Sequence, residues 1–491
     1  MTTDPNRYAG PAEAALLRSH IIAEEDEMAR VQSRLAAVGT TLHDAEQRLL
    51  AAQEETASAR AILVQIQSRE ENLAQSLRVA RGLLHPIRRL PADILSSIFE
   101  TWLDETERDE KIRPVTYRAE HLPFVAGRVC RRWRHVALST ASLWTGVKLA
   151  LDEAKLAPVA WLTYLESVLH RSKSLPIHVD VYASGVEDGT VTRVAAVLLV
   201  SSNRWCSLHI STSGPPSPDV RAIAGCRRTP LLETLSVYIG DEHHSSPPLS
   251  LPSYAPRLHT VDINEIFVDW NTCSRMDNVK ELKYHMLLAP VNIADFALIA
   301  SLMPNLERLR LLLLRGARGN SPAITFPRVT FAELNTDSVF AQTVRCPRLE
   351  HLDLTDLGTR SDISTFEAFV RNSQIQDTLR VLVVRAASLG SGFAHTLHLL
   401  KSIEEFETHN CALHDEFFAP LSGPGLGGSW SMPQLRRFHA YLKGSGHTGE
   451  RMPCSADALR SMVAARRAAA AAGSANAPKA VEDVLRSGWN A

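Results

Sequence analysis

The chain has 491 residues, of which 45% are hydrophobic and 22% are charged, and its formal net charge is −1. That length exceeds what one hydrophobic core organises, so we expect two or three structural units of a soluble globular protein. A net charge close to zero gives no general attraction to nucleic acid or to an acidic membrane surface, and neither is expected as a partner.

The N-terminal residues, the apolar stretches and the cysteines indicate the cellular compartment. The first ten residues, MTTDPNRYAG, lack the apolar core of a secretory signal. No stretch approaches the roughly 18 uninterrupted apolar residues of a bilayer span. The seven cysteines are scattered and never form a C-x-x-C pair, which argues against a disulfide framework and a thiolate zinc site. We therefore expect a cytoplasmic or nuclear protein.

The N-terminal region is predicted to be one long helix. From Ala12 to His85 there is no proline, and the only glycines are Gly39 and Gly82. Apolar residues recur every seven positions in two series, which is the a and d pattern of a left-handed coiled coil. The first series is Ile21, Met28, Leu35, Leu42, Leu49, Thr56, Leu63, Glu70, Leu77 and Leu84. The second is Leu17, Glu24, Val31, Val38, Ala45, Ala52, Ala59, Ile66, Leu73 and Ala80. We predict a disordered segment over residues 1–14 and a coiled-coil helix over residues 15–84.

Two interpretations of this apolar stripe remain open. It pairs with another chain, as a homodimer or with a different coiled-coil partner, or it folds back onto the body of its own chain. A stripe only two positions wide in seven is narrower than the buried face of a globular helix, which favours pairing. Glu24, Thr56, Glu70 and the alanines weaken the stripe.

The next segment, His85–Trp102, reads HPIRRLPADILSSIFETW. Pro91 suits the first turn of a helix, and Asp93 in that turn meets the positive end of the helix dipole. The apolar residues that follow share one helical face: Ile94, Leu95, Ile98, Phe99 and Trp102. After the charged segment Thr106–His121, a second helix is predicted with this apolar face: Val129, Cys130, Trp133, Val136 and Ala137. Helices this short and this apolar normally need a partner.

These residues resemble a known family. Leu90-Pro91-Ala92-Asp93-Ile94-Leu95-x-x-Ile98-Phe99, then Val129-Cys130-Arg131-Arg132-Trp133-Arg134 and Leu143-Trp144, is similar to the F-box, in particular to the F-box proteins numerous in mushroom-forming fungi. The resemblance implies a small all-α F-box over residues 85–145 that binds the Skp-type adaptor of a cullin–RING ubiquitin ligase. It also implies that the adaptor-facing surface is formed or supported by Leu90, Pro91, Ile94, Leu95, Ile98, Phe99, Val129, Cys130 and Trp133.

The chain departs from the family pattern in two ways: Asp93 replaces the more usual Glu, and the insertion between the two halves is longer. An alternative is that these residues are only the core of a helical domain. A nucleic-acid patch over Arg128–His135 is not favoured, because Trp133 is the only aromatic residue there and the net charge is not basic.

Beyond Trp144 one pattern recurs: often proline, then leucine, two polar residues, leucine, one residue, and a further apolar position. Before it come an apolar segment (Val147–Leu151), an amphipathic stretch (Trp161–Leu169) and a strand-like run (Ile177–Val181). Clear copies are Pro230–Val237, Pro256–Ile263, Asp277–Tyr284, Pro304–Leu311, Pro347–Leu354, Asp377–Val384 and Pro433–Ala440. Weaker copies are Trp205–Ile210, Val329–Leu334 and Ile403–Phe406.

Leucines at the first, fourth and sixth positions form a short strand whose inward side chains fill a stacked core. The copies are similar to degenerate leucine-rich repeats, so residues 146–455 are predicted to form an irregular α/β solenoid that binds a target protein. The overall class is thus α+α/β. The alternative is an ordinary α/β domain with leucine-rich strands. Residues expected near an exposed strand face are His351, Asp353, Arg380, Arg436 and His439. Residues 456–491 are predicted to be a helix that frays into a flexible tail.

Several apparent chemical motifs are not expected to function. GPGLGG, Gly423–Gly428, matches a dinucleotide fingerprint but contains a proline and opens no helix. His409, Cys411 and His414, like His395 and His398, have no second ligand pair at zinc spacing. We find no catalytic constellation and expect no enzyme activity, metal or cofactor.

The sequence therefore predicts a substrate-recognition subunit of an SCF-type ubiquitin ligase, with the F-box on a Skp-type adaptor and an unknown target protein on the repeats. One alternative is a coiled-coil and leucine-rich-repeat scaffold unrelated to ubiquitin. A second is an enzyme with a site in the repeat loops, which no residue pattern supports.

Overall fold

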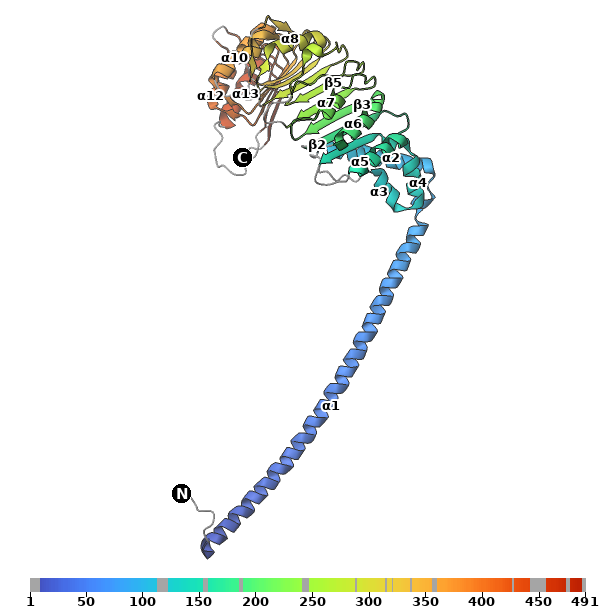
Figure 1. The fold of residues 1–491 in the computed structure, drawn as a ribbon. Helices are drawn as coiled ribbons and strands as arrows, with labels where there is room; N and C mark the ends of the chain where they lie inside the picture. The colour runs from blue at the N-terminus through green and yellow to red at the C-terminus, as the bar shows by residue number, and fades with distance from the viewer. Residues whose placement is uncertain are drawn as a thin grey trace. The chain divides into compact units, whose positions relative to one another are not determined.

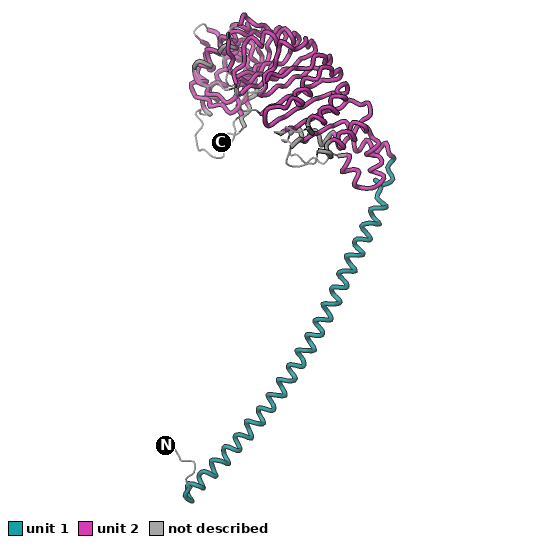
Figure 2. Tube along the Cα trace, in the orientation of Figure 1, with its two compact units in different colours: residues 1–91 teal, residues 92–491 magenta. Residues whose placement is uncertain are grey.

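The fold was analysed in a computed structural model. It describes residues 9–112, 122–152, 158–184, 189–240, 247–287, 289–313, 316–319, 321–335, 338–355, 360–425, 428–441, 456–473 and 477–487. The chain divides into two compact units, residues 1–91 and residues 92–491 (Figure 2). The second unit begins seven residues later than the expected domain boundary at residue 85.

The first unit is dominated by α1 (Pro11–Leu84), a helix of 74 residues, followed by the short 3₁₀ helix η1 (Pro86–Arg89). The predicted long helix is confirmed and starts earlier than expected, so residues 11–14 are helical; residues 1–8 lie outside the described part. Pro11 occupies the first turn, where its missing N–H costs nothing. The helix stops at Leu84 because His85 precedes Pro86 and is extended, at φ −59° and ψ 133°.

The second unit begins with a helical module, which we define as residues 92–144. It comprises α2 (Ala92–Ile112), α3 (Leu122–Val129), α4 (Arg131–Ser139) and the 3₁₀ helix η2 (Ala141–Trp144). The sequence predicted one helix through Val129 and Trp133, and the structure corrects this. Cys130 is extended and its Sγ accepts a hydrogen bond from the Trp133 N–H at 3.5 Å, so it caps α4 and separates it from α3.

Among the described residues, thirteen parallel strands follow one another in a single sheet (Figure 1). They are β1 (Gly146–Asp152), β2 (Ile177–Ser184), β3 (Trp205–Thr212), β4 (Thr234–Ile239), β5 (Thr260–Asn264), β6 (Glu281–Met286), β8 (Arg308–Leu313), β11 (Phe331–Asn335), β13 (His351–Thr355), β14 (Val381–Arg385), β16 (Glu405–His409), β18 (Arg437–Tyr441) and β19 (Asp483–Ser487). Neighbours in the sheet are thus neighbours in the chain, as expected where each strand–helix unit packs on the one before it.

Helices and short connecting strands lie on one face of this sheet (Figure 1). The helices are α5 (Pro158–Arg171), α6 (Gly189–Val200), α7 (Pro218–Ala224), α8 (Ile293–Leu302), α9 (Ser338–Thr343), α10 (Arg360–Ser373), α11 (Ser391–Thr396), α12 (Asp415–Phe418) and α13 (Ala456–Ala471). Two-residue strands pair as β7 (Val291–Asn292) with β9 (Ala317–Arg318), β10 (Ile324–Thr325) with β12 (Val344–Arg345), and β15 (Ser388–Leu389) with β17 (Ala412–Leu413).

The core lies between the sheet and these helices. One row of strand residues is aligned in register and completely buried: Leu235, Val261, Leu282, Leu309, Ala332, Leu352, Leu382, Phe406 and Phe438. Each belongs to the second leucine of a repeat copy or to its equivalent. Burying such a row is the main source of stability, at about 1.5–3 kcal/mol per large apolar side chain.

The predicted α+α/β class is confirmed at this level. All ten repeat copies coincide with a strand, and the strand-like run at Ile177–Val181 coincides with β2. The apolar segment Val147–Leu151 forms β1. The tail differs from its prediction. Its helix is present as α13, but residues 483–487 then form β19, which pairs with β18 instead of ending as a flexible segment.

Candidate functional site

The helical module holds together through aromatic contacts between the two halves of the sequence motif. Leu95 and Phe99 of α2 are completely buried. The ring of Phe99 packs edge to face on Trp133 of α4, with 5.0 Å between centroids. At the end of the module, the Trp144 Nε1–H donates to the Ala137 carbonyl at 2.8 Å. The motif residues therefore meet in one small core.

The nine predicted docking residues divide by exposure. Leu95 and Phe99 are inside the module and can only support a surface. Leu90, Cys130 and Trp133 are half-buried. The solvent-exposed members are Pro91, Ile94, Ile98 and Val129.

The exposed members are large apolar side chains with much of their surface in water. Ile94 is 47% exposed, Ile98 40% and Val129 57%. Ile94, Ile98 and Trp102 follow one another at four-residue spacing and so share one face of α2. The list of predicted residues missed Trp102, Phe124 and Leu138, which are also 38–40% exposed. Apolar residues exposed together on one small module indicate a docking surface.

The second candidate surface is the open face of the sheet, by which we mean the face opposite the helices. Alternate strand residues point to it. Its central row, aligned in register, is Lys148, Asp180, His209, Ser236, Asp262, Lys283, Arg310, Glu333, Asp353, Val383, Glu407 and His439. The row is polar almost throughout, and it belongs to strands whose opposite face is the core.

Charges on the open face are compensated between neighbouring strands. Arg310 contacts Glu281 at 3.2 Å and Glu333 at 3.0 Å. Arg385 holds the buried carboxylate of Asp353, with its Nε 2.9 Å from both oxygens and Nη2 at 2.8 Å from one. This bonding raises the pKa of Arg385. Because charges of both signs pair across the strands, the face offers shape and hydrogen bonding to a ligand rather than one sign of charge.

Aromatic rings interrupt this polar surface. Phe331 stacks on the His351 ring at 4.6 Å between centroids, and the Arg308 guanidinium lies 4.2 Å from the Phe331 centroid. Burial lowers the pKa of His351. Tyr238 on β4 is 47% exposed, the largest exposed fraction among the aromatic side chains of the strand residues described on this face. Exposed tyrosines of this kind are common anchors in protein interfaces.

A cluster toward the C-terminal end of the face contains metal-ligand atoms. Glu405, Glu407 and His439 each bring one such atom within 4.8 Å of the others. Burial raises the pKa of Glu405, and a hydrogen bond with Glu407 adds to this. For Glu407, burial acts to raise the pKa, but hydrogen bonds with His409 and His439 outweigh it and the pKa is lowered. Glu405 also pairs with Arg437 at 3.0 Å, so these carboxyl groups are already compensated without a cation.

The five residues expected near an exposed strand face are placed as follows. His351, Asp353 and His439 belong to the open face, and Arg380 and Arg436 precede their strands. Arg380 instead pairs with Glu404 at 2.8 Å. Arg385, Glu407 and Tyr238 were missed, although their alternation with the buried positions marks them as outward-facing.

Residues of the apparent chemical motifs make hydrogen bonds within the chain. In the described part of Gly423–Gly428, which omits residues 426 and 427, the Gly425 N–H donates to the Ser429 carbonyl at 2.8 Å within a loop before β18. Cys411 is buried and its thiol donates to the Val384 carbonyl at 3.2 Å. His414 bonds to Ser388 at 3.0 Å.

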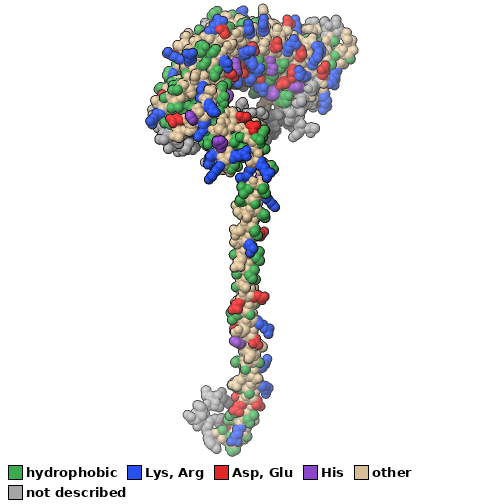
Figure 3. All heavy atoms as spheres, turned by 90° about the vertical axis from the view of Figure 1, so that its right-hand side faces the viewer, with side chains coloured by type: hydrophobic (Ala, Val, Ile, Leu, Met, Phe, Trp, Pro, Cys, Tyr) green, Lys and Arg blue, Asp and Glu red, His purple; other side chains and the backbone are tan. Residues whose placement is uncertain are grey.

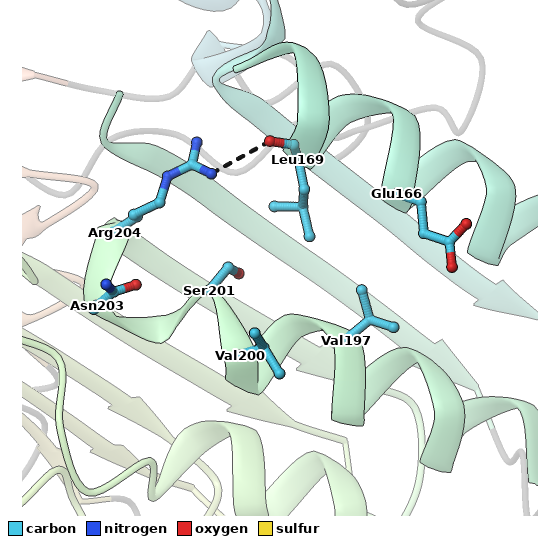
Figure 4. A pocket seen from close by; sticks show the side chains of 7 residues that line it. All are labelled: Glu166, Leu169, Val197, Val200, Ser201, Asn203 and Arg204. Carbon is cyan, nitrogen blue, oxygen red and sulfur yellow. Dashed lines mark hydrogen bonds between the residues drawn. The ribbon is translucent and has the colours of Figure 1, made fainter. Parts of the chain in front are cut away.

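A shallow hollow of about 450 Å³ lies on the helical face between α5 and α6 (Figure 4). Leu169, Val197 and Val200 line it, and Val200 is 85% exposed. Arg204 lies at the edge of the hollow and binds residues at and after the end of α5. Its guanidinium donates to the carbonyls of Leu175 and Leu169 and to the Ser172 hydroxyl at 2.6–3.3 Å. These hydrogen bonds give Arg204 a structural role at the edge of the hollow.

A comparison with models of protein families finds no match, and none of the curated proteins matches the chain. Within the residues that the structure describes, no helix combines the length and apolar character that crossing a membrane requires.

Proposed function

We propose that this chain is a substrate-recruiting F-box subunit of an SCF-type ubiquitin ligase. The observation that carries the proposal is the helical module. Leu90-Pro91 immediately before it and Cys130-Arg131-Arg132-Trp133 within it match the F-box in order, and Phe99 and Trp133 from the two halves are packed on each other. Ile94, Ile98 and Val129 remain exposed, as expected for side chains that a Skp-type adaptor covers.

The remainder of the second unit is proposed to be a degenerate leucine-rich-repeat solenoid that holds the target protein. This is supported by ten repeat copies that each coincide with one strand, and by strands that follow one another in chain order. The open face is the proposed target site, because the helices of the described residues lie on the other face and the open face carries paired charges and aromatic rings, among them Tyr238.

In this function the chain performs no chemistry. The module attaches to the adaptor and, through it, to the cullin, while the open face keeps the target near the ubiquitin-charged enzyme. Holding two reactants together raises their effective concentration and is sufficient to accelerate transfer. No cofactor or metal is required.

The test is co-expression of the full chain with a Skp-type adaptor, followed by affinity capture of the adaptor and size exclusion. We expect a stable one-to-one complex of subunits. Ile98→Asp and Val129→Asp place charge on exposed module residues and should abolish capture. Val200→Asp places the same charge on a still more exposed apolar residue of α6 and should not.

A chain that is well folded and ignores the adaptor would replace this proposal by the alternative, a coiled-coil and repeat scaffold not linked to ubiquitin. The exposed apolar surface of α1 and the open sheet face both suit that alternative, so the adaptor experiment decides between them.

A further inference from the structure

The long helix α1 presents an apolar surface that nothing in its own unit covers. None of its 74 residues is buried. Large apolar side chains are exposed from one end to the other, among them Leu17 at 49%, Leu49 at 59% and Leu84 at 69% (Figure 3). At 1.5 Å per residue the helix is about 110 Å long. An isolated helix of this kind leaves a large apolar area in water, which is unfavourable at about 25 cal/mol per Å².

The spacing of these side chains restricts what can cover them. The two heptad series repeat every 3.5 residues, whereas an α-helix has 3.6 residues per turn. The stripe therefore moves around a straight helix by about 20° per heptad. Over the length of α1 this drift reaches roughly half a turn, so a flat surface would meet only part of the stripe. A second helix that winds around α1 can follow all of it.

A second copy of α1 is a suitable partner helix. With the first series at the a positions and the second at d, identical chains in parallel register place each layer on its own copy. Leu35, Leu42 and Leu49 form successive leucine layers, and Ala45, Ala52 and Ala59 between and after them allow the helices to approach closely. Glu24 and Glu70 are the charged layers. They lie toward the two ends, so the centre of the contact is continuous except at Thr56.

Charges beside the layers agree with the same arrangement. In a parallel pair, each g residue lies near the e residue five positions later in the partner. These pairs run from His20 with Glu25 to Ser76 with Arg81, and none of them joins like charges. Glu55 meets Arg60 with opposite charge. An antiparallel pair centred on the helix would instead place Arg48 against Arg48 and Glu46 against Glu46.

We infer that α1 forms a parallel, in-register, two-stranded coiled coil with a second copy of this chain. This inference does not depend on the proposed ligase function. Each assembly then carries two helical modules and two open sheet faces, so a partner with two binding segments would gain avidity without any new contact.

The test uses the purified full chain and a matched pair of variants. Sedimentation equilibrium should give about 108 kDa, twice the chain mass of 54.1 kDa. Leu49 and Leu50 are adjacent and similarly exposed, at 59% and 52%, but only Leu49 belongs to the stripe. Leu49→Asp should raise the dimer Kd at least about a hundredfold, and Leu50→Asp should leave it within about threefold.

Two further variants examine the layers and the orientation. Glu70→Leu should lower the Kd at least about tenfold, while Glu71→Leu, on the outer face, should not. Because α1 contains no cysteine, Leu42→Cys should give a disulfide-linked dimer on mild oxidation, beyond the background of the unaltered chain. A 54.1 kDa monomer at micromolar concentration, a larger oligomer, equal effects of Leu49→Asp and Leu50→Asp, or failure of Leu42→Cys to cross-link would overturn the inference.

Discussion

Phe99 and Trp133 meet edge to face at 5.0 Å and join α2 to α4. Because Phe99 is completely buried, Phe99→Ala should leave a cavity and lower the free energy of unfolding of the module by about 3–5 kcal/mol. Ile98 is the neighbouring residue and is 40% exposed, so Ile98→Ala should cost under about 1 kcal/mol. Chemical unfolding followed by tryptophan fluorescence measures both. Equal losses for the two variants would contradict the packing described here.

The same contrast separates docking from folding in the helical module. Leu95 is as buried as Phe99, so Leu95→Asp would unfold the module, and a loss of adaptor binding would then say nothing about the surface. Exposed positions such as Ile98 and Val129 are the informative ones.

Asp353 and Arg385 form the best-bonded ion pair of the open face. Arg385→Met removes the partner of a carboxylate that is 7% exposed and should lower the stability by about 1–3 kcal/mol. Adding Asp353→Asn removes the uncompensated charge and should recover part of that loss. Thermal and chemical unfolding of the four proteins of this double-mutant cycle give the coupling.

A surface pair provides the control for that cycle. Arg371 and Glu367 are 3.8 Å apart and 64% and 38% exposed. Arg371→Met should change the stability by less than about 0.5 kcal/mol, since exposed pairs are well screened. A loss as large as that of Arg385→Met would mean that burial does not determine the effect.

The strands were predictable from sequence because the leucine spacing records burial directly. Leu232, Leu235 and Val237 of one copy are all at most 1% exposed, and the same alternation identifies the residues of the open face. The helix α1 was predictable for a related reason: heptads and the absence of proline depend only on local sequence, and Pro86 marks the end.

Other features depend on contacts between distant segments and could not be predicted in this way. Cys130 interrupts a helical pattern that looks continuous in the sequence. It has an extended backbone and caps the N-terminus of α4, so α3 ends before it. The tail strand β19 has no leucine signature and is defined by pairing with β18. Among the predicted docking residues, spacing identified the apolar face of α2 but did not distinguish buried Leu95 from exposed Ile94.

Arg466 of α13 shows how the tail is attached to the sheet unit. It is completely buried, and its guanidinium donates to the carbonyls of Ser431 at 3.0 Å and Met432 at 2.6 Å. Arg466→Met should remove both hydrogen bonds, leaving the Met432 carbonyl with the Leu435 N–H at 3.1 Å, and cost about 2–4 kcal/mol. Hydrogen exchange should then accelerate in α13 and β19 before the rest of the sheet. Arg460→Met, at an exposed position of α13, is the control and should leave exchange unchanged.

The open face should also make stability depend on pH. Burial lowers the pKa of His351, with Arg308 and Arg385 acting in the same direction and Asp353 and Glu407 opposing them. Above about pH 6.5, the ordinary histidine pKa, the ring is neutral in both the folded and the unfolded chain. Its protonation then takes nothing from the free energy of unfolding. As the pH falls from there toward the lowered folded pKa, the unfolded chain takes up the proton first. Stability therefore decreases, by at most about 1.4 kcal/mol per pH unit for one proton.

His351→Gln removes the pH-dependent part of the stability that comes from His351. His285 and His398, whose pKa values burial also lowers, still contribute their own parts. Urea unfolding at pH 7.5 and 5.5 should thus show a smaller acid-induced loss in His351→Gln than in the unaltered chain. Identical losses in the two proteins would show that the His351 ring has the same proton affinity folded and unfolded, against its burial between Phe331 and its charged neighbours.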